Sequence, residues 1–308
     1  MKAEVQTLPA AVSYRGVLRL LFASTRPQEW VKNTFVFAPL LFSRNLLNPD
    51  LLARSFEASG CFCLASAGVY LINDICDRER DKKHPQKRRR PIASGTLPVS
   101  IATTAAIVLL SIATIGALAL DLALGVVICS YITLNIAYSN WLKHQVILDV
   151  FSIAAGFVLR VVGGAVVIDV VMSHWLLICT MLLALFLGFS KRRYELVNLA
   201  QDAPLHRRVL AEYDPLFLDM MIGIVTSVTV IAYTLYTISN ETVQRFHTDK
   251  LLVTVPFVLY GIFRFLYQVY HKNGGGNPAR TLITDGPLLV NILLWGAVCG
   301  VILYTAGS

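Results

Sequence analysis

Three long stretches of this chain carry no charged side chain, and they constrain the fold more than any other feature. Ile101–Leu120, Leu122–Trp141 and Pro287–Ser308 contain no Asp, Glu, Lys or Arg. A helix needs about 20 apolar residues to cross the hydrocarbon core of a membrane. With 56% hydrophobic residues, 15% charged residues and a mean hydropathy of +0.61, the whole chain is too apolar for a soluble domain. The sequence therefore predicts an all-α polytopic membrane protein.

Hydropathy along the chain predicts nine transmembrane helices, which together form one domain over residues 28–308. Residues 1–27 precede this domain and carry Arg15 and Arg19 among apolar residues. That pattern suits a helix lying in the cytoplasmic interface, or a simple lead-in to the first span. The predicted spans are 28–46 (the weakest by hydropathy), 52–75, 99–119, 121–141, 146–168, 172–192, 215–238, 251–270 and 286–306.

Lys and Arg gather on one side of these predicted spans. If the N-terminus is inside, the outer loops keep only Arg44, Arg54, Arg245 and Lys250, and most of the 27 Lys and Arg are inside. Loops rich in Lys and Arg stay in the cytoplasm, so we predict an N-terminus inside and a C-terminus outside. The net charge of +8 then belongs to the cytoplasmic face of a membrane protein and does not indicate nucleic-acid binding.

The most unusual polar stretch, Leu71–Gly95, follows the second predicted span. Asn73, Asp77 and Asp81 recur at every fourth position, so they lie on one face if the helix continues past the apolar run. Such oxygen-bearing side chains suit Mg²⁺, which binds through one or two carboxylates and substrate phosphates. We predict a metal and diphosphate site here, with Asp77, Asp81 and the adjoining Asp74 as its catalytic carboxylates.

A basic run follows the acidic residues directly and includes Lys87, Arg88 and Arg90. Arg can grip phosphate oxygens bidentately, and Lys binds them as a point charge. The alternative is a cytoplasmic loop whose positive charges only set the topology. That alternative leaves the carboxylates at helical spacing unexplained, so we favour diphosphate binding.

Further polar residues fall at the inner ends of other spans. Lys143 lies in a very short loop, Asp149 lies one turn into the fifth span, and Lys191–Arg193 follow the sixth. For the basic residues among them, anchoring at the membrane interface is the alternative to a functional role.

Arg160 falls near the middle of the fifth span, where a charged side chain is costly. It follows Asp149 by eleven residues, so the two share a helix face about 16 Å apart, too far for a direct pair. We predict that Arg160 points into the bundle and has a hydrogen-bond partner from another helix. The shared polar face also suggests a cavity that reaches inward from the cytosol.

These motifs together resemble the UbiA-type intramembrane prenyltransferase superfamily. N-D-x-x-D-x-x-x-D at 73–81, K-R-x-R-P-I-x-x-G at 87–95 and Y-S-x-x-L-K at 138–143 match it in sequence and placement. The resemblance extends over essentially the whole chain and implies a nine-helix bundle with a cytosol-facing active-site cavity. It also implies that Asn73, Asp77 and Asp81 face Mg²⁺ on a diphosphate leaving group.

The chain departs from the aromatic-substrate members after the sixth span, where they carry a second acidic motif, D-x-x-x-D. Here that place reads K-R-R-Y-E at 191–195. One acidic motif facing a basic one suits two phosphate-bearing substrates. This pattern resembles the decaprenyl-phosphate phosphoribosyltransferase branch, as do R-P-x-x-W-V-K-N at 26–33 and L-K-H-Q at 142–145.

The resemblance implies transfer of a 5-phosphoribosyl group from phosphoribosyl diphosphate to a polyprenyl phosphate in the bacterial cytoplasmic (inner) membrane, for arabinose supply to cell-envelope glycans. Lys87, Arg88 and Arg90 would then bind diphosphate, and Lys32, Lys143, Lys191 and Arg192 the phosphates of ribose or lipid. Asp149 and Tyr194 would contact ribose hydroxyls, and Arg160 would belong to the site or to the scaffold.

Two other functions remain as alternatives. Prenylation of an aromatic acceptor, for quinone or haem biosynthesis, is disfavoured by the missing second acidic motif. A transporter or channel would explain the many spans and an intramembrane Arg, but it does not explain carboxylates gathered at the cytoplasmic end. No inverted repeat of broken helices is visible in the sequence either.

Overall fold

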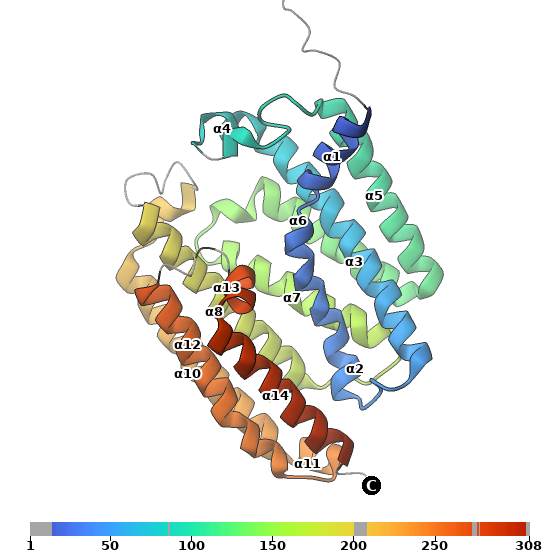
Figure 1. Ribbon diagram of the computed structural model, residues 1–308, viewed down its shortest axis with the longest axis vertical. Coiled ribbons are helices and arrows are strands. Elements are labelled where there is room, and N and C mark those ends of the chain that lie inside the picture. The colour runs from blue at the N-terminus through green and yellow to red at the C-terminus, as the bar shows by residue number, and fades with distance from the viewer. Residues whose placement is uncertain (1–13, 86, 200–207, 273–275, 277, 306–308) are drawn as a thin grey trace, which may run out of the picture.

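The computed structural model describes residues 14–85, 87–199, 208–272, 276 and 278–305. All regular secondary structure in these ranges is helical, which confirms the predicted fold class, and Figure 1 shows the resulting bundle. The elements are α1 (Tyr14–Ser24), η1 (Pro27–Phe37), α2 (Ala38–Phe42), α3 (Pro49–Cys76), α4 (Arg78–Lys83), η2 (Lys87–Arg89), α5 (Val99–Leu120), α6 (Leu122–Asn140), η3 (Leu142–His144), α7 (Leu148–Val167), α8 (His174–Leu199), η5 (Arg208–Glu212), α10 (Pro215–Ile238), α11 (Asn240–Phe246), η6 (Lys250–Thr254), α12 (Val255–His271), α13 (Pro278–Thr284) and α14 (Gly286–Thr305).

Eight helices in the described ranges are long and apolar enough to cross a membrane: α3, α5, α6, α7, α8, α10, η6 with α12, and α14. They match the last eight predicted spans within a few residues at nearly every end. The exception is α8, which continues to Leu199, whereas the predicted span ends at residue 192. The basic segment 191–193 therefore lies on a helix and not in a loop.

The first predicted span, 28–46, is not among these eight helices. It consists of η1, a 3₁₀ helix of 11 residues, and the five-residue α2, so nine spanning α-helices are not confirmed. At about 2.0 Å per 3₁₀ residue and 1.5 Å per α residue, the two still extend over roughly 30 Å, the thickness of the hydrocarbon core. A ninth crossing through this segment therefore stays a prediction.

The η1 segment packs closely against α7 because Gly164 of α7 has no side chain at the point of contact. A Cβ built on Gly164 would lie 2.0 Å from the carbonyl oxygen of Val36, so only glycine allows this backbone contact. Val36 and Asn33 are buried as a result. The segment 26–33 is thereby held beside α3 and α7.

Polar caps separate the long helices. The side chain of Asn48 accepts hydrogen bonds from the backbone N–H groups of Asp50 and Leu51 at the start of α3. Asp121 ends α5 and caps α6 through the N–H groups of Ala123 and Leu124, so these two helices form a tight hairpin.

Of the four hydrophobic clusters among the described residues, α7 contributes to the two largest. Val150, Ala154 and Phe157 of α7 pack with residues of α8, α10 and α12. Val167, at the other end of α7, packs with α3, α5 and α6. Figure 1 shows α7 between the α3–α5–α6 part and the α8–α10–α12–α14 part of the bundle. The centre of the molecule is therefore where η1, α3, α6 and α7 meet.

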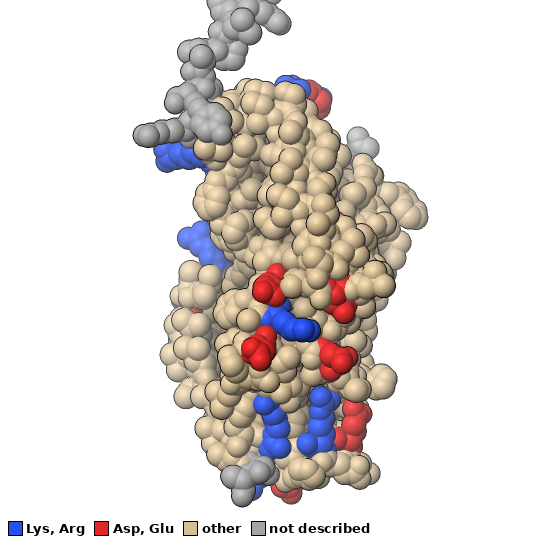
Figure 2. Space-filling model, turned by 90° about the vertical axis from the view of Figure 1, so that its right-hand side faces the viewer, with Lys and Arg blue, Asp and Glu red and all other residues tan. Residues whose placement is uncertain are grey.

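The sides and ends of the bundle differ in polarity. Ile107 and Ile115 are exposed along α5, as expected for side chains that contact lipid. Asp50, Arg54 and Glu57 are exposed on the first turns of α3. Figure 2 views the right-hand side of Figure 1, where this end of α3 lies, and shows carboxylates grouped around a basic side chain. The acidic motif lies at the opposite end of α3.

Candidate functional site

The acidic motif does not form one continuous helical face. The α-helix α3 ends at Cys76, Asp77 is its C-cap, and α4 begins at Arg78. The sequence expectation of a shared face required the helix to continue, so it is wrong. The motif instead divides into two groups with different partners.

The first group contains Asn73 and Asp77, which lie against the end of α6 and the loop that follows. Ser139 donates a hydrogen bond to the side-chain oxygen of Asn73 (3.1 Å). The Lys143 ammonium lies 2.6 Å from the Asp77 carboxylate. Asp77 keeps 22% of its side chain exposed, so a ligand can reach it.

The second group contains Asp74 and Asp81, which two arginines hold. Arg90 donates to Asp81 (2.6 Å) and to Asp74 (3.0 Å), and Arg26 also donates to Asp74. The two carboxylates are only 3% and 4% exposed at their side chains. The sequence analysis did not select Arg26, although it opens the R-P-x-x-W-V-K-N motif. Its φ of 52° and its stacking over the Tyr70 ring at 5.0 Å come only from the fold.

The rest of the basic run borders this second group. The short helix η2 leads from Lys87, which is half-buried, and Arg88, which is exposed, to Arg90. The structure thus places the run beside the acidic motif, as the sequence predicted.

Two more predicted phosphate ligands lie on η1 and α8. The Lys32 ammonium is 2.5 Å from Glu29, and Lys191 is 4.0 Å from Glu195. Both lysine side chains are about one-third exposed (30% and 33%), so they remain accessible.

Asp149 and Arg192 have no exposed side-chain surface. The Arg192 Nε donates to Asp149 (2.5 Å), its Nη1 donates to Glu195 (2.8 Å), and Tyr213 donates to the second oxygen of Asp149 (2.8 Å). No substrate reaches this pair without a rearrangement. The geometry therefore favours a supporting role over the substrate contacts predicted for Asp149 and Arg192.

Tyr213 is a member of this network that sequence reasoning missed. It follows η5 and precedes α10, where a lone tyrosine carries no recognisable signal. Burial, with the nearby charge of Asp149, raises the pKa of the Tyr213 hydroxyl above its ordinary value. The hydroxyl therefore stays protonated and remains a hydrogen-bond donor.

Arg160 is 5% exposed and points into the bundle. It donates to Asn33 on η1 (2.7 Å), to Tyr131 on α6 (2.9 Å) and to the carbonyl oxygen of Gly156 (2.8 Å). Its guanidinium also lies 4.7 Å from the centre of the Tyr131 ring. The prediction of a partner from another helix is confirmed, and these contacts tie η1, α6 and α7 together.

Tyr194 is half-buried in the C-terminal part of α8. Its ring packs on Gly276, where an added Cβ would lie 2.6 Å from a ring carbon. Gly276 thus covers one side of this tyrosine.

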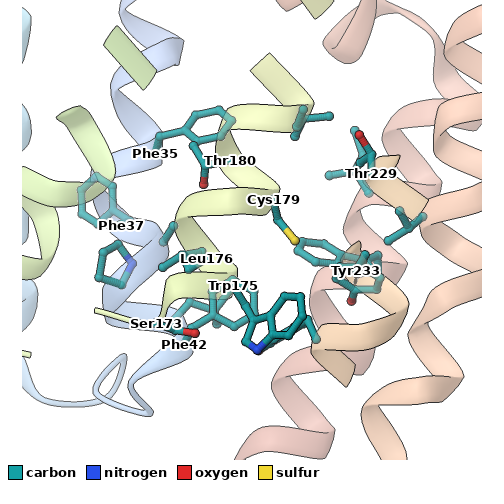
Figure 3. A pocket seen from close by; sticks show the side chains of 18 of the residues that line it. Phe35, Phe37, Phe42, Ser173, Trp175, Leu176, Cys179, Thr180, Thr229 and Tyr233 are labelled. Atoms are coloured by element: carbon teal, nitrogen blue, oxygen red, sulfur yellow. Dashed lines mark hydrogen bonds between the residues drawn. The ribbon is translucent and has the colours of Figure 1, made fainter. Parts of the chain in front are cut away.

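A large apolar cavity of about 690 Å³ lies between α2 and the α8–α10–α12–α14 part of the bundle. Figure 3 shows Phe35, Phe37 and Phe42 on one side, Trp175, Leu176, Cys179 and Thr180 of α8 on another, and Thr229 and Tyr233 of α10 opposite. The lining includes Thr34 and Phe35 of η1 and reaches Leu187 of α8, one turn before Lys191, while its charged residues, Glu241 and Arg245, belong to α11.

An acidic motif held by Arg and Lys, beside an apolar cavity in a membrane bundle, defines an intramembrane enzyme that handles phosphorylated and lipidic groups. The chain belongs to the UbiA prenyltransferase family, which matches residues 34–283.

Two named bacterial enzymes and one solved structure are similar to this chain over most of its length. The decaprenyl-phosphate phosphoribosyltransferase of Mycolicibacterium smegmatis is 30% identical over 99% of this chain and 98% of its own length. The enzyme of the same name from Corynebacterium glutamicum is 31% identical over 89% of this chain and 84% of its own. A UbiA homologue from Archaeoglobus fulgidus, solved with GPP and Mg²⁺, has a TM-score of 0.71 at 17% identity and covers 92% of this chain and 99% of its own.

The residues of the first group fit a magnesium ion bound with diphosphate. In the described part of the chain, no three His, Cys, Asp or Glu side chains lie close enough to hold a metal by themselves. Mg²⁺ does not require such a cage, because it usually binds one or two carboxylates and completes its shell with phosphate and water oxygens. Asp77 and Asn73 can provide the protein ligands, whereas Asp81 must first leave Arg90.

Proposed function

We propose that this protein transfers the 5-phosphoribosyl group from phosphoribosyl diphosphate to a polyprenyl phosphate and releases diphosphate. The observation that carries the proposal is the concentration of cations at and beside the acidic motif. Arg26, Arg90 and Lys143 contact its carboxylates, and Lys32 and Lys191 lie along η1 and α8. So many cations suit two phosphate-bearing substrates. The names of the two bacterial relatives support the same reaction.

The first group would bind the leaving diphosphate. Asn73 and Asp77 would hold Mg²⁺, and Lys143 and Arg90 would donate hydrogen bonds to diphosphate oxygens, with Lys87 and Arg88 at the edge. When bound, Mg²⁺ would neutralise charge on the diphosphate. Lys32 and Lys191 would bind the ribose 5-phosphate or the lipid phosphate, and Tyr194 would contact the ribose.

During transfer, the bond between ribose C1 and the diphosphate oxygen breaks, and an oxygen of the lipid phosphate bonds to C1. The diphosphate leaves with the electron pair of the broken bond. Arg and Lys side chains fixed at the leaving oxygens stabilise the charge that develops there. The lipid phosphate is already ionised at neutral pH, so the site needs no strong general base.

The lipid chain would occupy the apolar cavity. Its lining is mostly aromatic and aliphatic, and it includes Leu187, one helical turn before Lys191, and Thr34, two positions after Lys32. A polyprenyl phosphate could therefore place its phosphate at the charged end while its chain remains in an apolar environment.

A reconstitution assay tests the proposal. Purified protein in lipid vesicles with Mg²⁺, phosphoribosyl diphosphate and polyprenyl phosphate should release diphosphate only when both substrates are present. Geranyl diphosphate with an aromatic acceptor serves as the competing substrate pair. Turnover of that pair, without turnover of the first, would overturn the proposal in favour of an aromatic prenyltransferase.

We also propose that the protein lies in the bacterial cytoplasmic membrane as one nine-span domain, residues 28–308, preceded by the segment 1–27. The N-terminus would be inside and the C-terminus outside. Residues 1–13 of that first segment lie outside the described residues, and its helix α1 packs on α3. After removal of the exposed Cys76 and Cys129, an impermeant thiol reagent should label His247→Cys in intact cells and Ser94→Cys only after permeabilisation. The opposite labelling would contradict this orientation.

A further inference from the structure

The backbone turns sharply at Ile147, just before α7. Its φ of 69° and ψ of −48° lie in a region that β-branched residues avoid. The Leu148 N–H donates to the carbonyl oxygen of Val146 at 2.8 Å, which closes a γ-turn of the rare, strained type with positive φ. The Ile147 side chain is 37% exposed, so its own burial does not explain the conformation.

The hydroxyl of Tyr213 holds this turn from outside. It accepts a hydrogen bond from the Ile147 N–H (2.7 Å) and donates one to Asp149 (2.8 Å). Asp149 is fixed in turn by Arg192. Tyr213 is only 6% exposed and its ring stacks on Phe217, so the hydroxyl has a defined position. A strained backbone persists only where its surroundings determine it in this way.

The same turn ends the loop that carries Lys143. Lys143 lies in η3, four positions before Ile147, and η3 packs against η5, which leads to Tyr213. The Lys143 ammonium contacts Asp77 at 2.6 Å. A loop this short cannot absorb a change at Ile147 without moving η3, so the position of the ammonium depends on the turn.

We infer that Tyr213 is a positioning residue: its hydroxyl holds Ile147 in the γ-turn and thereby fixes Lys143 beside Asp77. The inference rests on the proposed function for the role of Lys143 as a phosphate ligand. Tyr213 itself touches no substrate.

Tyr213→Phe tests the inference because it removes the hydroxyl and keeps the ring. Tyr304→Phe is a matched control, since the Tyr304 hydroxyl also accepts a backbone N–H, that of Leu46, at the opposite end of the bundle (2.8 Å). We expect the KM for phosphoribosyl diphosphate to rise about tenfold or more in Tyr213→Phe, because a small displacement of a binding group has effects of this size. The kcat should change much less, and Tyr304→Phe should keep both constants.

Ile147→Gly distinguishes a role of Tyr213 in holding the γ-turn from a general contribution of Tyr213 to the stability of the fold. Glycine adopts a positive φ without a steric penalty, so the turn should form without help from Tyr213. The double variant Ile147→Gly with Tyr213→Phe should therefore recover most of the KM. The Tm of the double variant should still lie below that of the wild type, because Asp149 lacks the tyrosine hydroxyl as a donor.

Hydrogen exchange at the amides of Ile147 and Leu148 tests the turn without any substrate. Exchange at both should be faster in Tyr213→Phe than in the wild type and in Tyr304→Phe. Equal exchange, an unchanged KM, or a KM that Ile147→Gly fails to restore would each overturn the inference. Failure of the wild type to use phosphoribosyl diphosphate would instead reject the proposed function, while the exchange comparison would still report on the turn.

Discussion

Each carboxylate of the acidic motif lies against at least one basic side chain. Arg90 alone contacts both Asp74 and Asp81, and Lys143 contacts Asp77. Asp74 and Asp81 are almost fully buried, and a buried carboxylate is stable only when it is paired and hydrogen-bonded. Under the proposed function, the same cations bind phosphate oxygens, so the motif and its partners serve both the fold and the reaction.

Asp77 should be essential for turnover and dispensable for folding. Asp77→Ala removes the accessible carboxylate, and we expect the rate to fall by about a hundredfold or more, as for loss of a group that stabilises transition-state charge. Diphosphate release per milligram of membrane protein measures the effect. Glu57→Ala, an exposed carboxylate at the other end of α3, is the control and should be neutral. Near-normal turnover of Asp77→Ala at limiting Mg²⁺ would refute the metal assignment.

At the scale of elements, the C-terminal part of α8 directs three consecutive basic residues to three places. Successive residues of a helix point about 100° apart. Arg192 accordingly turns to Asp149, and Lys191 lies 4.0 Å from Glu195 on the same helix. Arg193 pairs with Asp219 (2.8 Å) and stacks on the Tyr270 ring at 3.9 Å. Of the three, Lys191 has the most exposed side chain, at 33% against 0% for Arg192 and 16% for Arg193.

Reversal of that charge should separate the two enzyme hypotheses. Lys191→Glu replaces attraction by repulsion, so we expect the affinity for a phosphorylated substrate to fall by about tenfold or more. Titration calorimetry with phosphoribosyl diphosphate and Mg²⁺ measures this affinity. Lys250→Glu, at the other end of the bundle, is the matched reversal and should have no effect. An aromatic prenyltransferase would tolerate Lys191→Glu, since its members carry acids at this place.

The helices α12 and α14 are joined by an ion pair at Asp285. Arg264 donates two hydrogen bonds to its carboxylate, each of 2.9 Å, and Gln268 donates a third. The hydrogen bonds from Arg264 lower the pKa of Asp285 below its ordinary value. The folded protein therefore prefers the ionised form.

This pKa shift predicts a pH-dependent stability. Because the folded pKa is lowered, the stabilisation is fully present above the ordinary Asp value of about 3.9 and is lost as pH falls through the folded pKa. The Tm of Asp285→Asn should lie below that of the wild type at pH 6, and the gap should close toward pH 3. Asp249→Asn, on the exposed connection before η6, is the control. A gap that stays constant over this range would contradict the prediction.

At the scale of the whole molecule, charge and apolar volume are separated along the bundle. The acidic motif and its cations occupy one end, and the cavity of about 690 Å³ extends away from them between α2, α8 and α10. Such a separation suits a substrate that has a charged head and a long apolar chain.

A bulky side chain in the cavity should lower the turnover of long-chain polyprenyl phosphates more than that of short-chain ones. Cys179→Trp places a large ring where Figure 3 shows the Cys179 side chain among the lining residues. We expect turnover of a long polyprenyl phosphate to fall by about tenfold, while a short-chain polyprenyl phosphate reacts almost normally. Cys129→Trp, on an exposed face of α6, is the matched control. Equal losses with both lipids would indicate general damage to the fold.

Local sequence determined eight of the membrane helices and the burial of Arg160. The reason is that charge in hydrocarbon is costly wherever the helices pack, so hydropathy alone locates α5 or α14. The side-chain spacing of Asn73 and Asp77 is local as well, and it predicted a polar group at the end of α3. Only the continuation to Asp81 failed, because the helix breaks at Asp77.

The tertiary structure alone decided which charges meet. Asp149 and Tyr213 are 64 positions apart, and Arg26 and Asp74 are 48 apart, so no local pattern links them. Lys191 and Arg192 are adjacent basic residues that a local pattern does not distinguish. In the extended α8, Arg192 is fully buried, whereas Lys191 remains about one-third exposed. The strained turn at Ile147 is likewise invisible in sequence, since it exists only because the packing of η5 brings a tyrosine hydroxyl to its backbone.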